Sequence, residues 1–146
     1  MLTRTTDADL LTETPLARRS RLTISAARSF VGATAWLSPA FADRTYGYGL
    51  VDRQAGSFLV GRLFGARDLA LGLAVQHPDP AVRRAALQTG IVVDAADAVS
   101  SAIALRRGAS RVGTASVGVG ALSLVALGII ALSRDAVESE AGQDSV

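Results

Sequence analysis

The sequence predicts an all-α integral membrane four-helix bundle, and two observations lead to this fold class. Residues 112–133, VGTASVGVGALSLVALGIIALS, carry no charge between Arg111 and Arg134. As a helix they extend about 33 Å, which is enough to cross the hydrocarbon core of a bilayer. Three further apolar stretches precede this segment along the 146-residue chain. A helix that is apolar on all sides is rare in so small a soluble protein, so we expect this segment to span a membrane.

Helix start and stop signals delimit the expected spans. Asp79 can cap a helix that begins with Pro80, and Gly108 is a typical residue beyond a helix end. The short connections at 77–79 and 108–111 predict that neighbouring helices form antiparallel hairpins. We therefore expect four spans, over residues 22–38, 56–76, 80–107 and 112–133.

The segments outside these spans are polar. We expect a transmembrane domain at 21–134 between two disordered tails, the polar residues 1–20 and the acidic residues 135–146. The connection at 39–54 is expected to be an interfacial loop or a short re-entrant piece. A secretory signal cleaved after Ala42 is an alternative for the first span, because an A-x-A ending follows a basic start and an apolar stretch. Arg28 inside that stretch favours an uncleaved helix.

Composition excludes several function classes. The chain has no cysteine and one histidine, which argues against disulfides, thiol chemistry and a multi-histidine metal centre. Its arginines are scattered, and one Trp, two Tyr and four Phe are too few to form a stacking platform for nucleic acid. We therefore expect no metal, no cofactor and no nucleic acid. No motif assigns a catalytic residue. The candidate partners are membrane lipids, a second copy of the chain or another membrane protein.

The first three expected spans carry charges, although each charge at the bilayer centre costs about 2.5–3.5 kcal/mol. The second span includes RLFGARDLALG at residues 62–72, which holds charges of both signs. Apart from the arginine pairs at the two ends of the span 80–107, three charges are basic and three are acidic: Arg28, Arg62, Arg67, Asp68, Asp94 and Asp97. This balance predicts a polar network near the membrane midplane, in which guanidinium and carboxylate groups neutralise each other. Arg62 lies nearer a helix end and is also placed to reach the lipid headgroups.

Helical spacing puts most of these charges on faces of small residues. Small residues let helices approach closely, so we expect these faces to meet. Ser116, Gly120 and Ser123 of the last span are expected to cover the network. Steps of three and four residues define one such face in each of the first three spans: Ser25, Arg28, Gly32 and Ala35; Gly61, Gly65, Asp68 and Gly72; and Gly90, Asp94, Asp97 and Ser101.

Three motifs carry a family resemblance: GARDLALGL (65–73), RRAAL (83–87) and VVDAADA (92–98). They resemble a family of small four-span membrane proteins of bacteria and fungi that is known as a domain of unknown function, and more distantly the DoxX-like four-helix membrane proteins. The resemblance covers about residues 22–133. It implies a four-helix membrane bundle with Arg67 and Asp68 as characteristic residues, and it implies no activity.

Two functions stay open on this basis. The first is a small membrane protein that binds a partner or a lipid-like ligand, with the network specifying the bundle. The second is a proton- or ion-coupled transport component that uses Asp68, Asp94 and Asp97, because neighbouring carboxylates compete to retain a proton. A membrane enzyme with these carboxylates as acid and base, and a soluble bundle, are weaker alternatives.

The arginines also predict an orientation. With both termini in the cytoplasm, seven arginines lie inside and five lie outside. Basic residues concentrate on the cytoplasmic side of membrane proteins. We therefore expect a multi-pass protein of the cell membrane with cytoplasmic N- and C-termini.

Overall fold

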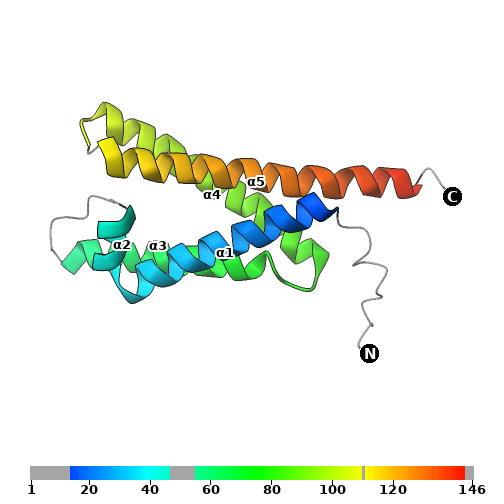
Figure 1. Ribbon diagram of the computed structural model, residues 1–146, viewed down its shortest axis with the longest axis horizontal. Helices are drawn as coiled ribbons and strands as arrows, with labels where there is room; N and C mark the ends of the chain where they lie inside the picture. Colours follow the sequence, from blue (N-terminus) through cyan, green and yellow to red (C-terminus); the bar gives the residue numbers. More distant parts are fainter. Residues whose placement is uncertain (1–13, 47–54, 110, 144–146) are drawn as a thin grey trace.

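The computed structural model describes residues 14–46, 55–109 and 111–143, and over these ranges it contains helices and no strand. The all-α class and a helix at each of the four expected places are thereby confirmed. Figure 1 shows the order along the chain, which is α1 (Pro15–Leu37), α2 (Pro39–Tyr46), α3 (Ala55–Ala74), α4 (Pro80–Arg106) and α5 (Arg111–Gln143).

Both expected tails are partly helical, which corrects the predicted boundaries. α1 begins at Pro15 because the Thr14 hydroxyl caps it, accepting a hydrogen bond from the Ala17 N–H at 3.2 Å. α5 continues past residue 133 to Gln143, so most of the acidic segment 135–146 is helical. Part of the expected connection forms α2, while residues 47–54 of that connection lie outside the described residues.

The ends of α4 follow the local sequence signals. The Asp79 carboxylate accepts a hydrogen bond from the Ala81 N–H at 2.8 Å, and Pro80 occupies the first helical position. Beyond the last turn, Gly108 has a φ of 86°, a conformation that favours glycine. Both predicted signals are confirmed.

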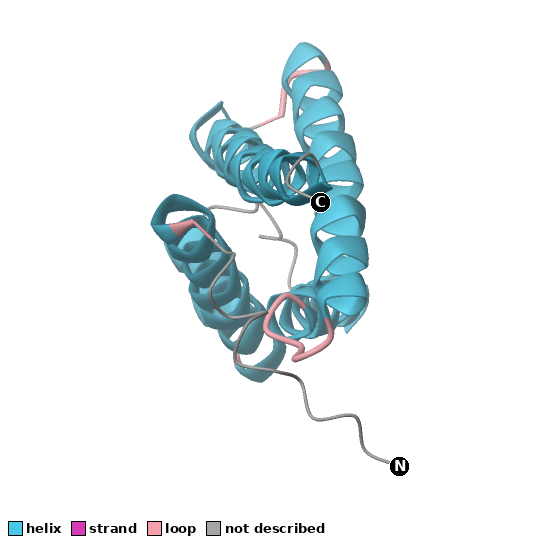
Figure 2. Cartoon of the chain, turned by 90° about the vertical axis from the view of Figure 1, so that its right-hand side faces the viewer, coloured by secondary structure: helices cyan, strands magenta, loops and turns pink. Residues whose placement is uncertain are grey.

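The four long helices form two antiparallel pairs, α1 with α3 and α4 with α5 (Figure 1). The pairing of α4 with α5 confirms the hairpin predicted at 108–111. The connection at 77–79 also reverses the chain, but α4 crosses away from α3 toward α5, and α3 and α4 pack against each other over a small part of their length. The end view in Figure 2 shows the two pairs side by side. The predicted reversal of the chain at 77–79 is therefore present, but α3 and α4 do not pack side by side as a hairpin.

Facing glycines bring α1 and α3 into backbone contact. A Cβ atom added to Gly32 would lie 2.7 Å from the Gly65 carbonyl oxygen, and one added to Gly65 would lie 2.6 Å from the Gly32 carbonyl oxygen. No side chain fits at such distances. The predicted meeting of these two small-residue faces is confirmed.

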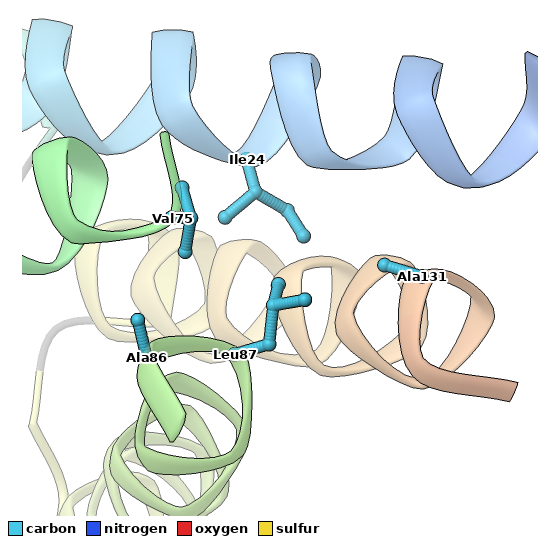
Figure 3. Packing of buried hydrophobic residues seen from close by; sticks show 5 residues of the cluster. All are labelled: Ile24, Val75, Ala86, Leu87 and Ala131. Carbon is cyan, nitrogen blue, oxygen red and sulfur yellow. The ribbon is translucent and has the colours of Figure 1, made fainter. Parts of the chain in front are cut away.

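A small apolar cluster joins the helices near the turn between α3 and α4 (Figure 3). Ile24 of α1 lies beside Val75, which directly follows α3. Ala86 and Leu87 of α4 and Ala131 of α5 complete the cluster. Apart from this cluster, the buried positions are mainly small or charged, so little apolar area is available there to hold the bundle together.

One helical segment in the described part of the chain, Arg111–Ser133 of α5, is long and apolar enough to cross a membrane. Of an apolar 18-residue stretch within this segment, 17% is buried inside the structure. α1, α3 and α4 carry the charges and do not meet the same criterion. The structure therefore provides one candidate span where the sequence predicts four.

We predict that Gly65→Ala destabilises the fold by about 1–3 kcal/mol, since the new methyl group overlaps the backbone of α1. This cost exceeds the gain in helix propensity, which is about 1 kcal/mol. Thermal unfolding followed by circular dichroism measures the change. Gly120→Ala on α5 is the matched control, because no atom lies within 4 Å of its added Cβ. Equal stability of the Gly65 variant and the wild type would contradict the close packing of α1 against α3.

Candidate functional site

Arg28 is the centre of a charged cluster at the middle of the bundle. Its side chain is 2% exposed, and its Nη1 donates to Asp68 Oδ1 at 3.0 Å. Its Nη2 donates to Asp94 Oδ2 at 2.5 Å and to the Gly90 carbonyl at 3.4 Å. Gly90 makes room for this contact, because a Cβ atom there would lie 3.0 Å from Arg28 Nη2. One guanidinium thus connects α1 with both α3 and α4.

Arg67 forms a second, more open centre. Its Nη2 donates to Asp97 Oδ2 at 2.8 Å and to Asp68 Oδ1 at 3.3 Å. Its guanidinium carbon also lies 4.3 Å from the centroid of the Phe64 ring, within the range of a cation–π interaction. The side chains of Arg67 and Asp97 are 32% and 24% exposed, whereas those of Asp68 and Asp94 are 6% and 4% exposed. Arg67 Nε is buried and has no hydrogen-bond partner within the described residues.

Five of the six predicted network residues therefore come together, and Arg62 does not. Arg62 is exposed, on a different side of α3 from the buried glycines and Asp68. The buried faces of α1, α3 and α4 include the expected small residues, because their spacing matches the helical period. The predicted balance of three charges of each sign is wrong for the cluster itself. It holds two guanidinium groups and three carboxylates, and its net charge is −1 when all five groups are ionised.

A cavity of about 410 Å³ lies beside the cluster, and all four long helices contribute to its walls. α5 supplies an apolar and small-residue wall, where Gly120 and Ala121 leave room. The Ser116 and Ser123 hydroxyls donate to carbonyl groups of their own helix, at 2.9 Å each. Both serines line the cavity. Because their hydroxyls are used within α5, they form no described hydrogen bond to the charged network, which the sequence predicted them to cover. The lining consists of Ala27, Arg28, Val31, Phe64, Arg67, Asp68, Asp94, Asp97, Ser116, Val117, Gly120, Ala121, Ser123, Leu124 and Leu127.

Sequence reasoning missed two members of this site. Phe64 lies three residues before Arg67, a spacing that places their side chains on one helix face, so the contact was detectable. The sequence did not indicate that the Gly90 carbonyl accepts a hydrogen bond from Arg28, because this contact depends on how α1 and α4 pack.

The cluster offers ion pairing and hydrogen bonding. Within residues 14–46, 55–109 and 111–143, no three His, Cys, Asp or Glu side chains are arranged to hold a metal ion. The cavity therefore combines charged groups on one part of its wall with apolar groups on the rest, as suits a ligand that has both a polar and an apolar part.

Comparisons with protein-family models, with curated proteins and with solved structures find no match to this chain. The resemblance to small four-span membrane proteins, carried by Arg67, Asp68 and the motifs around them, stays a prediction.

We predict that Arg28→Met destabilises the protein by about 3–5 kcal/mol, because it leaves Asp68 and Asp94 buried without their shared cation. Chemical or thermal unfolding measures the loss. Combining Arg28→Met with Asp68→Asn and Asp94→Asn should restore much of the stability, because the stranded charges are then removed. Arg62→Met, at an exposed position, should change stability by less than about 0.5 kcal/mol. A small effect of Arg28→Met alone would mean that this ion-paired centre does not hold the bundle together.

Proposed function

We propose that this protein is an integral membrane four-helix bundle that binds a lipid-like ligand in the cavity between its helices. The observation that carries the proposal is the cavity itself, whose wall places a charged cluster next to apolar side chains. The membrane setting and the ligand are supported by separate observations.

The distribution of polar and apolar groups supports a membrane setting. Large apolar side chains point outward along the middle of the helices; Leu63, Val92 and Leu122 are 62%, 68% and 59% exposed. The charged residues Arg28 and Asp94 are 2% and 3% exposed. Such an arrangement is unfavourable in water, whereas acyl chains solvate apolar side chains and leave paired charges inside the bundle.

Pairing explains how charged helices can cross a bilayer. The three most deeply buried charges form a chain in which Arg28 pairs with both Asp68 and Asp94, and none of them faces the outer surface. The free-energy cost of placing an isolated charge in a bilayer is therefore higher than the cost that applies to α1, α3 and α4, whose buried charges are paired. As helices of 20 and 27 residues, α3 and α4 extend about 30 and 40 Å, enough to cross the hydrocarbon core.

The cavity supports a ligand of lipid-like chemistry. Its volume of about 410 Å³ falls in the usual range for small-molecule sites, which is about 300–1,000 Å³. Val31, Leu124 and Leu127 offer contacts to an apolar tail, and Arg67 and Asp97 offer partners to a polar headgroup.

We predict that α4 crosses the membrane, which single-cysteine labelling can test in a chain that has no cysteine of its own. In sealed membrane vesicles, a membrane-impermeant maleimide should label His77→Cys and Arg107→Cys from opposite sides. Val92→Cys, at an exposed position in the middle of α4, should react only after the membrane is dissolved. Labelling of both helix ends from the same side, or of Val92→Cys in intact vesicles, would contradict the multi-pass topology.

We predict that the protein leaves native membranes with a bound amphiphile, which native mass spectrometry detects as an added mass. Gly120→Phe should remove this mass, because its side chain projects from the cavity wall and no atom lies within 4 Å of the added Cβ. Leu122→Phe, on the exposed side of α5, is the matched control and should retain the ligand. Loss from both variants, or from neither, would count against this cavity as the binding site.

The second candidate function is that of a proton- or ion-coupled transport component that uses Asp68, Asp94 and Asp97. The excess of one carboxylate over the two guanidinium groups favours it. In that case Asp97→Asn, which changes the open part of the cluster, should fold normally and abolish pH-dependent uptake into vesicles. In the ligand-binding role the protein drives no such uptake, and the same variant changes only ligand affinity or stability.

A further inference from the structure

We propose that the ligand of this cavity is an amphipathic cation, a molecule with an apolar tail and an ammonium group that pairs with Asp97. This inference rests on the proposed function and adds the charge of the ligand to it. Its basis is the uneven charge of the cluster and the position of Asp97 at the cavity.

The uneven charge calls for a third cation. Within the part of the chain that the structure describes, Asp68, Asp94 and Asp97 share two cations, Arg28 and Arg67, and Arg62 lies outside the cluster. In a membrane interior, one uncompensated negative charge is costly, and the remedies are a cation or a proton. An anionic headgroup would increase the imbalance, and a neutral headgroup would leave it unchanged.

The position of Asp97 makes it the carboxylate that a ligand can reach. Its side chain is partly exposed and lines the cavity, whereas the side chains of Asp68 and Asp94 are buried and held by Arg28. The cluster therefore has an inner part that holds the helices together and an outer part, Arg67 with Asp97, that faces the cavity.

Arg67 is placed to adjust when a cation arrives. It is shared between Asp97 at 2.8 Å and Asp68 at 3.3 Å, and its buried Nε has no acceptor among the described residues. If an ammonium group takes Asp97, Arg67 can stay with Asp68 while Arg28 stays with Asp94. Each carboxylate then has one cation, and the cluster is neutral.

The experiment compares four probes with the protein purified in an uncharged detergent: dodecylammonium, dodecanol, dodecanoate and methylammonium. Native mass spectrometry or the shift of the unfolding temperature gives the affinity of each, since a ligand that binds only the folded state raises stability. We expect dodecylammonium to bind about tenfold more tightly than dodecanol, because both can donate a hydrogen bond to the Asp97 carboxylate but the ammonium group also forms an ion pair with it. Methylammonium, which lacks a tail, should bind far more weakly.

Two variants assign this preference to a residue. Asp97→Asn should bring the affinities for dodecylammonium and dodecanol within about twofold of each other. Asp79→Asn removes the same charge at the exposed start of α4, where asparagine also caps a helix, and should keep the wild-type preference. If Asp97→Asn does not fold, the series of probes on the wild type decides the question alone.

The outcomes separate the two proposals. Equal or tighter binding of dodecanol or dodecanoate would overturn the cationic ligand and keep the lipid-like one, as expected if a proton balances the cluster. Tight binding of methylammonium would keep the cation and overturn the lipid-like ligand. Absence of binding by all four probes would overturn both. A wild-type preference for the amine that survives Asp97→Asn would overturn the role of Asp97.

Discussion

The ion pairs of Arg28 are the interaction on which the rest of this structure depends. Within each helix pair, small residues allow direct packing, as at Gly32 and Gly65. Between the pairs, α1 and α4 have no close backbone contact in the described part of the chain, and the long side chain of Arg28 bridges them. Its guanidinium reaches Asp68 on one side and Asp94 with the Gly90 carbonyl on the other. A lysine could not hold these acceptors in the same way, because its single ammonium group lacks the planar fork of donors.

The cavity is a consequence of this way of joining the helices. α1 packs directly against α5, whereas α1 and α4 stay apart and the side chain of Arg28 spans the gap between them. The apolar cluster around Ile24 and Leu87 fills the space at one end. Farther along, α5 presents Gly120 and Ala121, which are too small to close the remaining volume. Small residues thus have two effects: Gly32 and Gly65 permit close approach within a pair, and Gly120 and Ala121 leave room at the cavity. That room lies next to the charged groups because Arg28, the bridging residue, is itself charged.

The charged cluster has a buried part and an open part. Its buried part, Arg28 with Asp68 and Asp94, is fixed by short ion pairs and is remote from the outer surface. Its open part, Arg67 with Asp97, is more exposed and lines the cavity, and among the described residues Arg67 Nε has no hydrogen-bond partner. The carboxylate excess links the two parts, because a cation gained at the open part changes the electrostatic balance of the whole cluster.

The sequence by itself determined the features that local physics controls. Helix periodicity identified the buried faces that carry Arg28, Asp68 and Asp94, and capping chemistry placed the start of α4 at Asp79. Only the tertiary structure decided which charges pair and how α4 crosses away from α3. The physical reason is that spacing defines a face of one helix, whereas contacts depend on the rotation and crossing of two helices. The cavity follows from four helices at once, so no local pattern could have revealed it.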